Sequence, residues 1–467
     1  MNPVVVAGGG LAGSEAAWQL AERGVPVVLC EMRPASSTPA HKTDRLAELV
    51  CSNSLKSNAP GAASWLLKEE LRRSGSLLLG LADESAVPGG SALAVDRERF
   101  AEAVTAALAS HPRVRLERAE LHEIPHQTLC VIATGPLTSD SLAASLQALT
   151  GNGNLAFYDS ISPIVDAETL DHTRIFRASR YGKGGEDYLN CPLDEAEYRT
   201  FYDAMMAAES VQAHAFEDLN YFEACLPVEE LARRGFDTLR FGPMKPVGLV
   251  DPRTGCQPYA VVQLRPENLR YSSYNLVGFQ NHLKFPEQKR ILRLIPGLER
   301  AEFLRYGQIH RNTYINAPRL LAPDLSLRAA PDVFIAGQLS GVEGYVECIA
   351  TGLLAGRAVA ARALGEAFVP PPRSTALGSL VHYITHADPT NYQPANISFD
   401  LLPPPGNLPR AVMRDRSKRR AWQCNRALAE LEPWQAAEGA CIVDDASPAR
   451  VIGEEVKTAL GQSAPEN

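Results

Sequence analysis

Apolar positions in the first thirty residues form two short runs on either side of a helical repeat. Residues 4–7 are consecutively apolar, a glycine-rich turn occupies 8–13, and residues 14–23 place apolar side chains at helical spacing. A second apolar run covers 25–30. Short apolar runs next to glycines are typical of buried parallel strands, which need a crossover helix between them. The pattern predicts a strand, a tight turn, a helix and a second strand.

The same two patterns recur along the chain, with one interruption. Helical spacing predicts helices over 62–80 and 96–110, and Asp96 is a suitable N-cap for the second. From 186 to 299 the chain changes to charged helices and alternating strands such as 260–264, which predicts an inserted α/β domain. Further predicted elements are strands at 114–116, 128–134 and 333–337, and a helix of small residues over about 344–364.

These patterns predict an α/β fold with a discontinuous first domain. Residues 1–185 and 300–365 form its two parts, and residues 186–299 form the inserted α/β domain. Proline-rich segments near 370 and 403 bracket a C-terminal region over 366–467, which we expect to be helical. Its last ~20 residues are small and polar, a composition typical of disorder.

The amino-acid composition excludes only a few classes of protein. Hydrophobic residues make up 45% and charged residues 21%, as in an ordinary globular protein. No apolar run approaches the ~18 residues of a membrane helix, and the first residues lack a basic signal-peptide region. The nine cysteines include no C-x-x-C pair, which argues against a zinc site. We therefore expect a cytoplasmic protein with free thiols, no metal and no membrane segment. The net charge of −8 means that any nucleic-acid contact requires a local concentration of basic residues.

The glycine-rich turn has the spacing of a dinucleotide-binding fingerprint. Gly8 permits the tight turn, Gly10 lets a pyrophosphate approach the backbone, and Gly13 lets the helix pack close to the strand. The helix N-terminus then offers free N–H groups to an anion. Glu31 ends the second strand, where an acid can bind ribose hydroxyls. The predicted site also includes Gly9, Leu11 and Ala12.

Features outside the turn favour FAD over NAD. Glu31-Met32-Arg33 and the strand end Ala133-Thr134-Gly135 resemble the glutathione-reductase-like flavoproteins. So does the segment Phe334-Ile335-Ala336-Gly337, followed by Gly341, although a plain strand–helix packing unit would also explain that segment. The resemblance implies a Rossmann domain that binds FAD through Arg33, Gly135, Gly337 and Gly341. No second glycine fingerprint is visible, so a reduced nicotinamide is expected to reach the flavin through the open active site.

Two cysteines differ from the others in their surroundings. Cys51 lies in a polar loop, and Cys225 lies in the segment Phe222-Glu223-Ala224-Cys225-Leu226-Pro227. Cys30 and Cys130 lie inside apolar strands, where a buried structural thiol is expected. For Cys51 and Cys225, context alone leaves both a structural and a functional role open.

Several separated blocks resemble the folate- and FAD-dependent tRNA (uracil-5-)-methyltransferase family. The most specific are Cys51-Ser52-Asn53-Ser54 and the cysteine-containing block 223–235. The resemblance extends from residue 1 to about residue 365 and becomes loose beyond it. The remaining blocks are residues 7–15, 31–34, 241–249 and 310–314.

The resemblance implies formation of 5-methyluridine at position 54 in the T-loop of tRNA. Methylenetetrahydrofolate would supply the carbon, and FAD reduced by NAD(P)H would supply electrons. The resemblance also implies that Cys51 and Cys225 are both needed, one as the nucleophile at uracil C6 and the other as a base or protecting group. It does not divide these roles. His310 would close one face of the folate pterin, although a lone histidine in a structural role is an equal alternative. Glu343 would bind the pterin amino group, although a structural acid at a helix start is an equal alternative.

The strongest local signal for tRNA contact is the basic segment 410–420. It holds six positive charges against one negative charge. Such a run is either a solvated helix face or a phosphate-binding surface. Within a tRNA-modifying family we predict that Arg416, Lys418, Arg419 and Arg420 contact the T-arm.

Three other functions stay open at this stage. The first is the related FAD- and folate-linked family that builds a carboxymethylaminomethyl group on the wobble uridine, which normally carries a long helical C-terminal domain. The second is an NAD(P)H:flavin oxidoreductase without an RNA substrate. The third is a flavin-dependent RNA-binding protein without catalytic activity.

Overall fold

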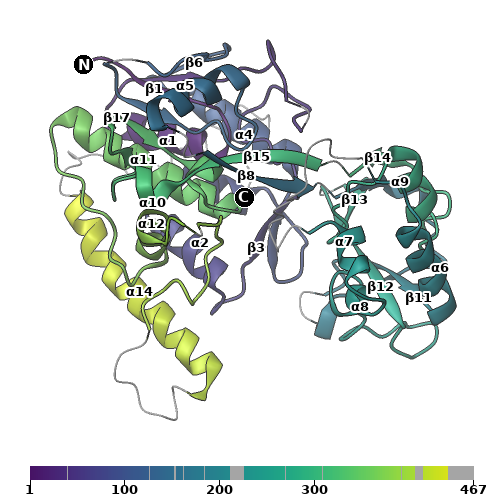
Figure 1. Ribbon diagram of the computed structural model, residues 1–467. Helices are drawn as coiled ribbons and strands as arrows, with labels where there is room; N and C mark the ends of the chain where they lie inside the picture. Colours follow the sequence, from purple (N-terminus) through teal and green to yellow (C-terminus); the bar gives the residue numbers. More distant parts are fainter. Residues whose placement is uncertain are drawn as a thin grey trace, which may run out of the picture.

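The chain folds into two lobes joined by a two-stranded ribbon (Figure 1). The ribbon consists of β8 (Asn154–Ser160) and β15 (Ile309–Ile315), which pair antiparallel. The computed structural model describes residues 1–467 except 39, 126, 152–153, 161, 183–184, 211–225, 269, 308, 391, 405–413 and 440–467.

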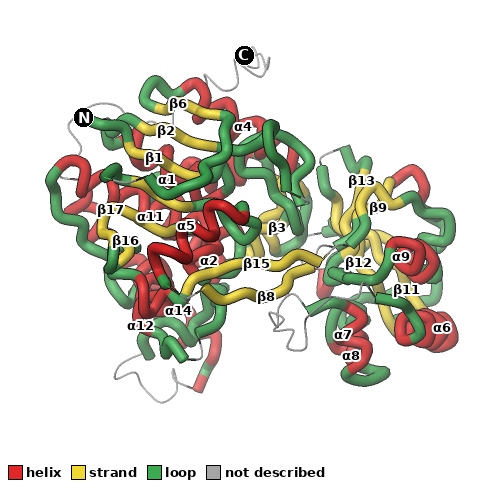
Figure 2. The backbone as a smooth tube through the Cα atoms, turned by 45° about the horizontal axis from the view of Figure 1, so that its top comes forward, coloured by secondary structure: helices red, strands yellow, loops and turns green. Residues whose placement is uncertain are grey.

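The larger lobe is built on a six-stranded sheet with the order β16-β17-β7-β1-β2-β6, flanked by helices (Figure 2). Ala7 of β1 pairs with Cys30 of β2 and Ile132 of β7, and Ile335 of β17 also pairs with Ile132. These parallel strands therefore end at one edge, and the order departs to both sides of β1, which creates a ligand-binding crevice there. The strands are β1 (Val4–Ala7), β2 (Val27–Cys30), β6 (Val114–Glu117), β7 (Cys130–Ile132), β16 (Ser326–Leu327) and β17 (Ala330–Ile335).

Two helices of this lobe cross almost at backbone contact. They are α1 (Leu11–Glu22) and α11 (Tyr345–Leu364). A Cβ added at Gly352 would lie 2.3 Å from the carbonyl oxygen of Ala12, and one added at Gly356 would lie 2.7 Å from that of Ala16. The small residues predicted over 344–364 are therefore required by this contact, which brings both helix N-termini to the same edge of the sheet.

The predicted helix over 62–80 is wrong, because the chain forms two helices there. These are α2 (Ala63–Arg73) and α3 (Leu77–Glu84). Gly75 has φ +68°, outside the helical range, and the Ser76 hydroxyl then caps α3 by accepting from the N–H of Leu79. Nearby elements are β3 (Ser54–Ser57), β4 (Ala86–Val87), β5 (Ala92–Val95), α4 (Arg97–Ser110) and α5 (Asp140–Thr150). The predicted cap of α4 is confirmed, since Asp96 accepts from two N–H groups of the first turn.

The smaller lobe has its own sheet, with the order β10-β11-β12-β13-β9-β14, and a separate hydrophobic core. Its strands run from Ile164 to Arg305, a wider span than the 186–299 expected for the insertion. Strands of two or three residues carry no readable hydrophobic period, so these outer strands had no sequence signal. The strands are β9 (Ile164–Asp166), β10 (Phe176–Arg177), β11 (Leu189–Leu193), β12 (Ala260–Pro266), β13 (Ser273–Leu276) and β14 (Phe303–Arg305). The helices are α6 (Glu195–Met206), α7 (Val228–Arg233), α8 (Thr238–Phe241) and α9 (Phe285–Leu292).

The C-terminal region packs as helices against the larger lobe. Buried Glu70 of α2 accepts from the N–H groups of Ala376 and Leu377 at the start of α12 (Ala376–His386). The indole N–H of Trp434 in α14 (Arg416–Gly439) donates to the carbonyl of Val369. The expected α/β fold with a helical C-terminal region is confirmed. Among the described residues, no helix is both long and apolar enough to cross a membrane. The remaining short helices are α10 (Ala317–Leu320) and the 3₁₀ turns at Ala167–Thr169, Arg180–Gly182 and Gly337–Ser340.

Candidate active site

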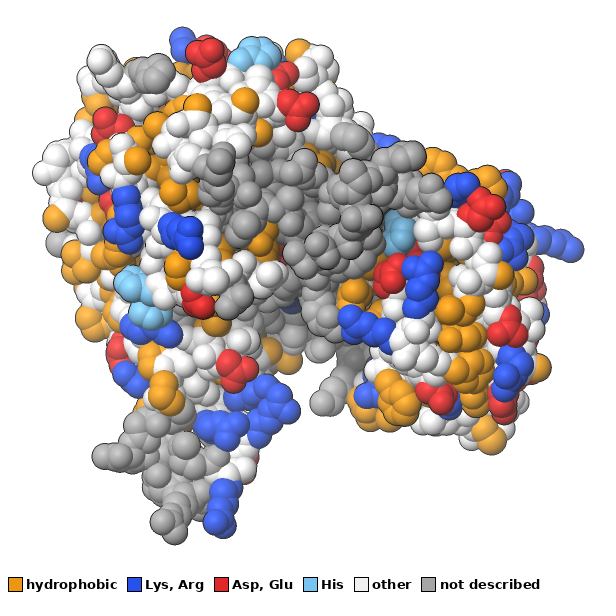
Figure 3. All heavy atoms as spheres, in the orientation of Figure 1, with side chains coloured by type: hydrophobic (Ala, Val, Ile, Leu, Met, Phe, Trp, Pro, Cys, Tyr) orange, Lys and Arg blue, Asp and Glu red, His pale blue; other side chains and the backbone are white. Residues whose placement is uncertain are grey.

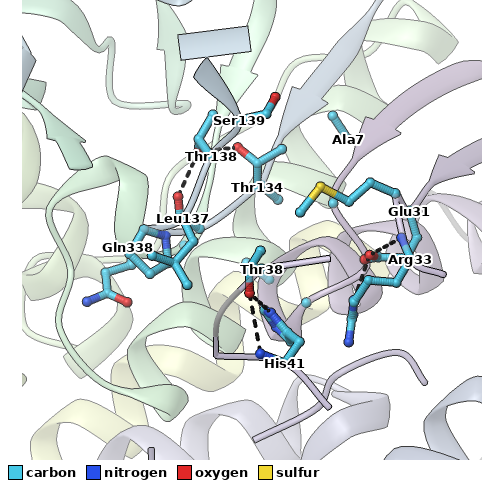
Figure 4. Close-up of a pocket in the computed structure, with 18 of the residues that line it drawn as sticks. Ala7, Glu31, Arg33, Thr38, His41, Thr134, Leu137, Thr138, Ser139 and Gln338 are labelled. Carbon is cyan, nitrogen blue, oxygen red and sulfur yellow. Dashed lines mark hydrogen bonds and ion pairs between the residues drawn. The ribbon is translucent and has the colours of Figure 1, made fainter. Parts of the chain in front are cut away.

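A deep cleft opens at the carboxyl edge of the main sheet. Its empty space, counted out to the open mouth, is about 1070 Å³. Figure 4 shows Glu31 and Arg33 on one side and Thr134, Thr138 and Gln338 on the other. Of the residues predicted from the sequence, those that line the cleft are Gly8, Gly10, Leu11, Ala12, Glu31, Arg33, Gly135 and Gly337.

Each of three glycines in the turn after β1 is required for a different structural reason. Gly8 has φ +97°, and a Cβ there would lie 2.7 Å from the Ala133 carbonyl oxygen. A Cβ at Gly13 would lie 1.8 Å from the Gly8 carbonyl oxygen, so only glycine lets α1 pack on the turn. A Cβ at Gly10 would meet nothing within 4 Å and would stand at the uncapped start of α1. The space in front of the free helix N–H groups therefore suits an anion such as a pyrophosphate.

Glu31 is held by the turn and by Arg33. One carboxylate oxygen accepts from the N–H of Gly9 at 2.8 Å, and the other accepts from Nε of Arg33 at 2.8 Å. Burial alone would raise the pKa of Glu31, but the hydrogen bonds and charge of Arg33 hold it below its ordinary value. Arg33 also donates to Glu48 at 3.0 Å. The carboxylate is thus ionised and oriented, with remaining acceptor capacity for ribose hydroxyls.

Only part of the glycine-rich segment 337–343 lines the cleft, and the rest supports it from behind. Gly337 has φ +72°, and its N–H donates to the Thr351 hydroxyl of α11. Gly341 does not line the cleft; a Cβ there would lie 2.3 Å from the Tyr392 hydroxyl. Glu343 also lies outside the lining and accepts from the side-chain amide of Gln338, which does line it.

Sequence reasoning missed His41, which lines the cleft from the polar loop after β2. Its Nδ1 lies 2.6 Å from the Thr38 hydroxyl (Figure 4). Burial, with the nearby charge of Arg33, lowers the pKa of His41 to about 4. The imidazole is therefore neutral at physiological pH. A lone histidine in a polar loop carried no signal for this position.

Cys51 lies in a half-buried loop that touches the flavin-type cleft through Tyr345. The Tyr345 hydroxyl accepts from the N–H of Cys51 at 2.8 Å and from that of Ser52 at 3.0 Å. Arg97, at the start of α4, donates to the Cys51 carbonyl at 3.4 Å. One tyrosine at the start of α11 thus lines the cleft and fixes the thiol loop.

The smaller lobe holds the same loop from its other side. Arg265 of β12, only 7% exposed, donates from Nε to Asn53 and from Nη2 to Ser52, each at 2.8 Å. Fully buried Asn53 donates in turn to the carbonyls of Val95 and Pro266. These contacts had no sequence signal, because the two partners are 212 positions apart.

Three cationic side chains surround the thiol loop. The guanidinium groups of Arg97, Arg265 and Arg305 all have a favourable electrostatic interaction with an ionised Cys51. Glu267 lies among them and forms an ion pair with Arg97. Cationic surroundings of this kind favour the thiolate form of a cysteine.

The other predicted site residues are not found at the cleft among the described side chains. Cys225 is outside the described residues. His310 lies on β15, where its backbone pairs with Asp159; its side chain is outside the described part. The basic residues Arg416, Lys418, Arg419 and Arg420 lie at the start of α14, away from the cleft lining. Within the described residues there is no group of three or more acidic, histidine or cysteine side chains placed to hold a metal ion.

Comparison with known proteins agrees with this geometry. The family model "Glucose inhibited division protein A" matches residues 3–367. A relative from Solibacter usitatus, named methylenetetrahydrofolate--tRNA-(uracil-5-)-methyltransferase TrmFO, is 62% identical over 441 residues, or 93% of this chain and 99% of the relative. A relative of the same name from Koribacter versatilis is 60% identical over 92% of this chain and 97% of its own.

A solved structure supports the fold. Aquifex aeolicus GidA superposes with a TM-score of 0.69, covering 98% of this chain and 77% of that one at 16% identity. Identity at that level is evidence for the fold alone. The motifs, the cleft and the near-full-length relatives together identify the chain as a member of the folate- and FAD-dependent tRNA (uracil-5-)-methyltransferase family.

Proposed function

We propose that this chain forms 5-methyluridine at position 54 in the T-loop of tRNA, in the cytoplasm, with methylenetetrahydrofolate as carbon donor and NAD(P)H as reductant. The observation that carries the proposal is the shared position of Tyr345. This side chain lines the dinucleotide cleft and accepts hydrogen bonds from the backbone of Cys51 and Ser52. A flavin-type cleft and a candidate nucleophile therefore meet at one helix start.

The residues of the cleft fit FAD. The open position at Gly10 and the free N–H groups of α1 suit its pyrophosphate, and the ionised Glu31 suits its ribose. When bound, FAD would supply the electrons that complete a methyl group from the folate methylene. Gly337, which lines the cleft beside Ala12 of α1, would face the flavin side of FAD, as in the flavoproteins that the sequence resembles.

The thiol loop explains how uracil could react. Uracil C5 is a weak nucleophile, so a thiolate adds to C6 and leaves an enolate with negative charge on C5. C5 then forms a bond to the one-carbon unit, and removal of the C5 proton by a base breaks the bond from that carbon to its carrier. A hydride, which reduced FAD would supply, then completes the methyl group as the thiolate is expelled from C6. Arg97 and Arg265 would favour the thiolate at Cys51. We propose that Cys51 and Cys225 share addition and proton removal, with the division between them left to experiment.

The folate site is proposed on the ribbon side of the cleft. His310 on β15 and Glu343, which precedes α11, are the proposed contacts to the pterin. The hydrogen bond from Gln338 to Glu343 supports this role, because it orients the carboxylate beside a residue of the cleft lining. The same bond would orient a purely structural acid, so a Glu343→Gln variant must be judged by its effect on KM for folate.

The decisive experiment uses purified protein, an unmodified tRNA transcript, methylenetetrahydrofolate labelled in the methylene carbon, and NADPH or NADH. We expect labelled 5-methyluridine in the transcript and none when uridine 54 is replaced by cytidine. Oxidation of the nicotinamide without labelled nucleoside would identify a flavin oxidoreductase. Label at the wobble uridine would identify the related modification.

A further inference from the structure

A second and larger groove lies at the start of α14. It runs between this helix, the segment 396–404 and the start of α2, and its empty space, counted to the open mouth, is about 1800 Å³. Four cationic side chains line it against one acidic side chain, Asp400. The cations are Lys56, Arg416, Arg419 and Arg420.

The charge at the start of α14 is opposite to what helix stability favours. Arg416, Lys418, Arg419 and Arg420 all fall within the first five residues of the helix. The macrodipole makes a cation in the first turn of a helix unfavourable. Asp415 offsets part of this by accepting from the N–H groups of Ser417 and Lys418. Helix stability therefore does not account for the remaining concentration of positive charge at this end of α14.

The groove also contains a flat apolar surface. The guanidinium carbon of Arg420 lies 5.1 Å from the centre of the Phe399 ring, and both residues line the groove. An aromatic ring beside arginines is the combination that binds a nucleic-acid strand, because the ring stacks on a base while the cations contact phosphates.

The groove leads toward the thiol loop. Lys56 lies in β3, the strand that follows the loop carrying Cys51. Its ammonium group forms an ion pair with buried Glu347 at 3.1 Å. Glu347 lies in the first turn of α11, two positions after the Tyr345 that holds the thiol loop. The inner end of the groove is therefore joined directly to the candidate active site.

We propose that this groove binds the sugar–phosphate backbone of the tRNA T-arm, with the three arginines on phosphates and Lys56 at the end nearest the target uridine. The proposal rests on the proposed function and adds the surface by which the substrate is held. Figure 3 shows Lys and Arg side chains gathered over the start of α14, at the edge of the opening between the lobes. Lys418 does not line the groove, so the predicted basic cluster is divided by the structure.

The size and charge of the groove favour RNA over the carboxylates of a folate. A folate tail needs one or two cations, whereas this groove presents four along an open channel with an aromatic wall. The chain as a whole carries a net charge of −8, so a phosphate-binding face must be concentrated somewhere.

The test measures binding of a T-arm RNA hairpin to the FAD-loaded protein over a series of salt concentrations. Combining Arg416→Ala, Arg419→Ala and Arg420→Ala should flatten the slope of log K against log salt by roughly two to three units, since each phosphate contact contributes about 0.7–0.9. Lys56→Met should flatten it by about one contact. Arg426→Ala is the matched control, because Arg426 lies on the same helix, pairs with Glu430 and does not line the groove.

Each other outcome is informative. An unchanged slope in the triple variant would refute binding of the RNA backbone in the groove. A loss of RNA affinity in Lys418→Ala as large as that in Arg419→Ala would also refute it. The whole basic segment, and not the groove residues alone, would then bind the RNA. A raised KM for methylenetetrahydrofolate with unchanged RNA binding would assign the groove to the folate instead. The binding assay needs no turnover, so absence of 5-methyluridine with wild-type protein rejects the proposed function without deciding the groove.

Discussion

Replacing Arg265 with methionine removes one of the two supports of the thiol loop and keeps the other, which is the Tyr345 hydroxyl. Methionine keeps most of the side-chain volume but removes both hydrogen bonds to the loop, those to Asn53 and Ser52. Hydrogen bonds from a charged donor contribute about 1.5–3 kcal/mol each. Burial lowers the pKa of Arg265, so removing the charge returns part of this energy. We expect a net loss of about 1–3 kcal/mol in the free energy of unfolding.

The expected effect on methyl transfer is larger than the effect on stability. The Tyr345 hydroxyl still holds the loop at Cys51, but the loop loses its anchor on the smaller lobe. A displacement of about 1 Å at a reacting group costs on the order of 10² in rate. Single-turnover transfer from pre-reduced enzyme to tRNA should therefore fall roughly 100-fold. Bound FAD and its reduction by NAD(P)H should be unchanged, because Arg265 does not line the cleft.

Arg177→Met provides the control. Arg177 is an exposed residue of β10 in the same sheet, and its side chain faces Tyr271 and Tyr274 rather than the thiol loop. Transfer by Arg265→Met at the rate of Arg177→Met would refute the positioning role. The rate of alkylation at Cys51, followed by peptide mass spectrometry, gives a second readout. A structural change far from the loop would not alter this rate.

Three further results are expected. Gly10→Leu should fold but purify without flavin, because the added side chain enters open space in front of α1; normal flavin absorbance would contradict this. Cys51→Ala and Cys225→Ala should each retain FAD and form no 5-methyluridine, while Cys130→Ala, changed in a buried strand, should stay active once folded; methylation by either of the first two would remove that residue from the mechanism. Because the pKa of His41 falls from 6.5 to about 4 on folding, the unfolded chain binds the extra proton between these values, and stability should decrease as pH falls through that window. Urea unfolding of wild type and His41→Asn across the window should show a weaker pH dependence in the variant, and identical curves would contradict the assignment.

Local patterns were sufficient for the dinucleotide turn. The reason for Gly13 lies within the turn itself, because its Cβ would meet the Gly8 carbonyl oxygen, whereas the contact that excludes a Cβ at Gly8 comes from distant Ala133. The cap at Asp96 is local in the same sense. The break between α2 and α3 was missed because Ser74, Gly75 and Ser76 interrupt an apolar pattern that otherwise continues in register. A glycine within a helical pattern is often tolerated, so composition alone did not locate the break.

Contacts between distant segments could not be predicted. Two such contacts are the hydrogen bond between Arg265 and Asn53 and the ion pair between Lys56 and Glu347. The residues of each pair belong to separate segments, so no single hydrophobic repeat relates them. An arginine inside a strand pattern gives no indication of whether it faces water or a buried partner. The groove at α14 was likewise visible only as a charge run, because Lys56 and Phe399 reach it from other parts of the chain.

The link between Asn53 and Arg265 also makes the loop that carries Cys51 dependent on both lobes. The two residues are separated by 212 positions, and closing so long a loop costs entropy before any contact repays it. The final shape of the loop that carries Cys51 therefore depends on the docked position of the smaller sheet. The glycine turn after β1 takes its contacts from the larger lobe alone, because Gly8 approaches Ala133, which follows β7, and Gly9 donates to Glu31, which follows β2. A disturbance of the smaller lobe would therefore reach the loop that carries Cys51 and leave the nucleotide-binding turn intact.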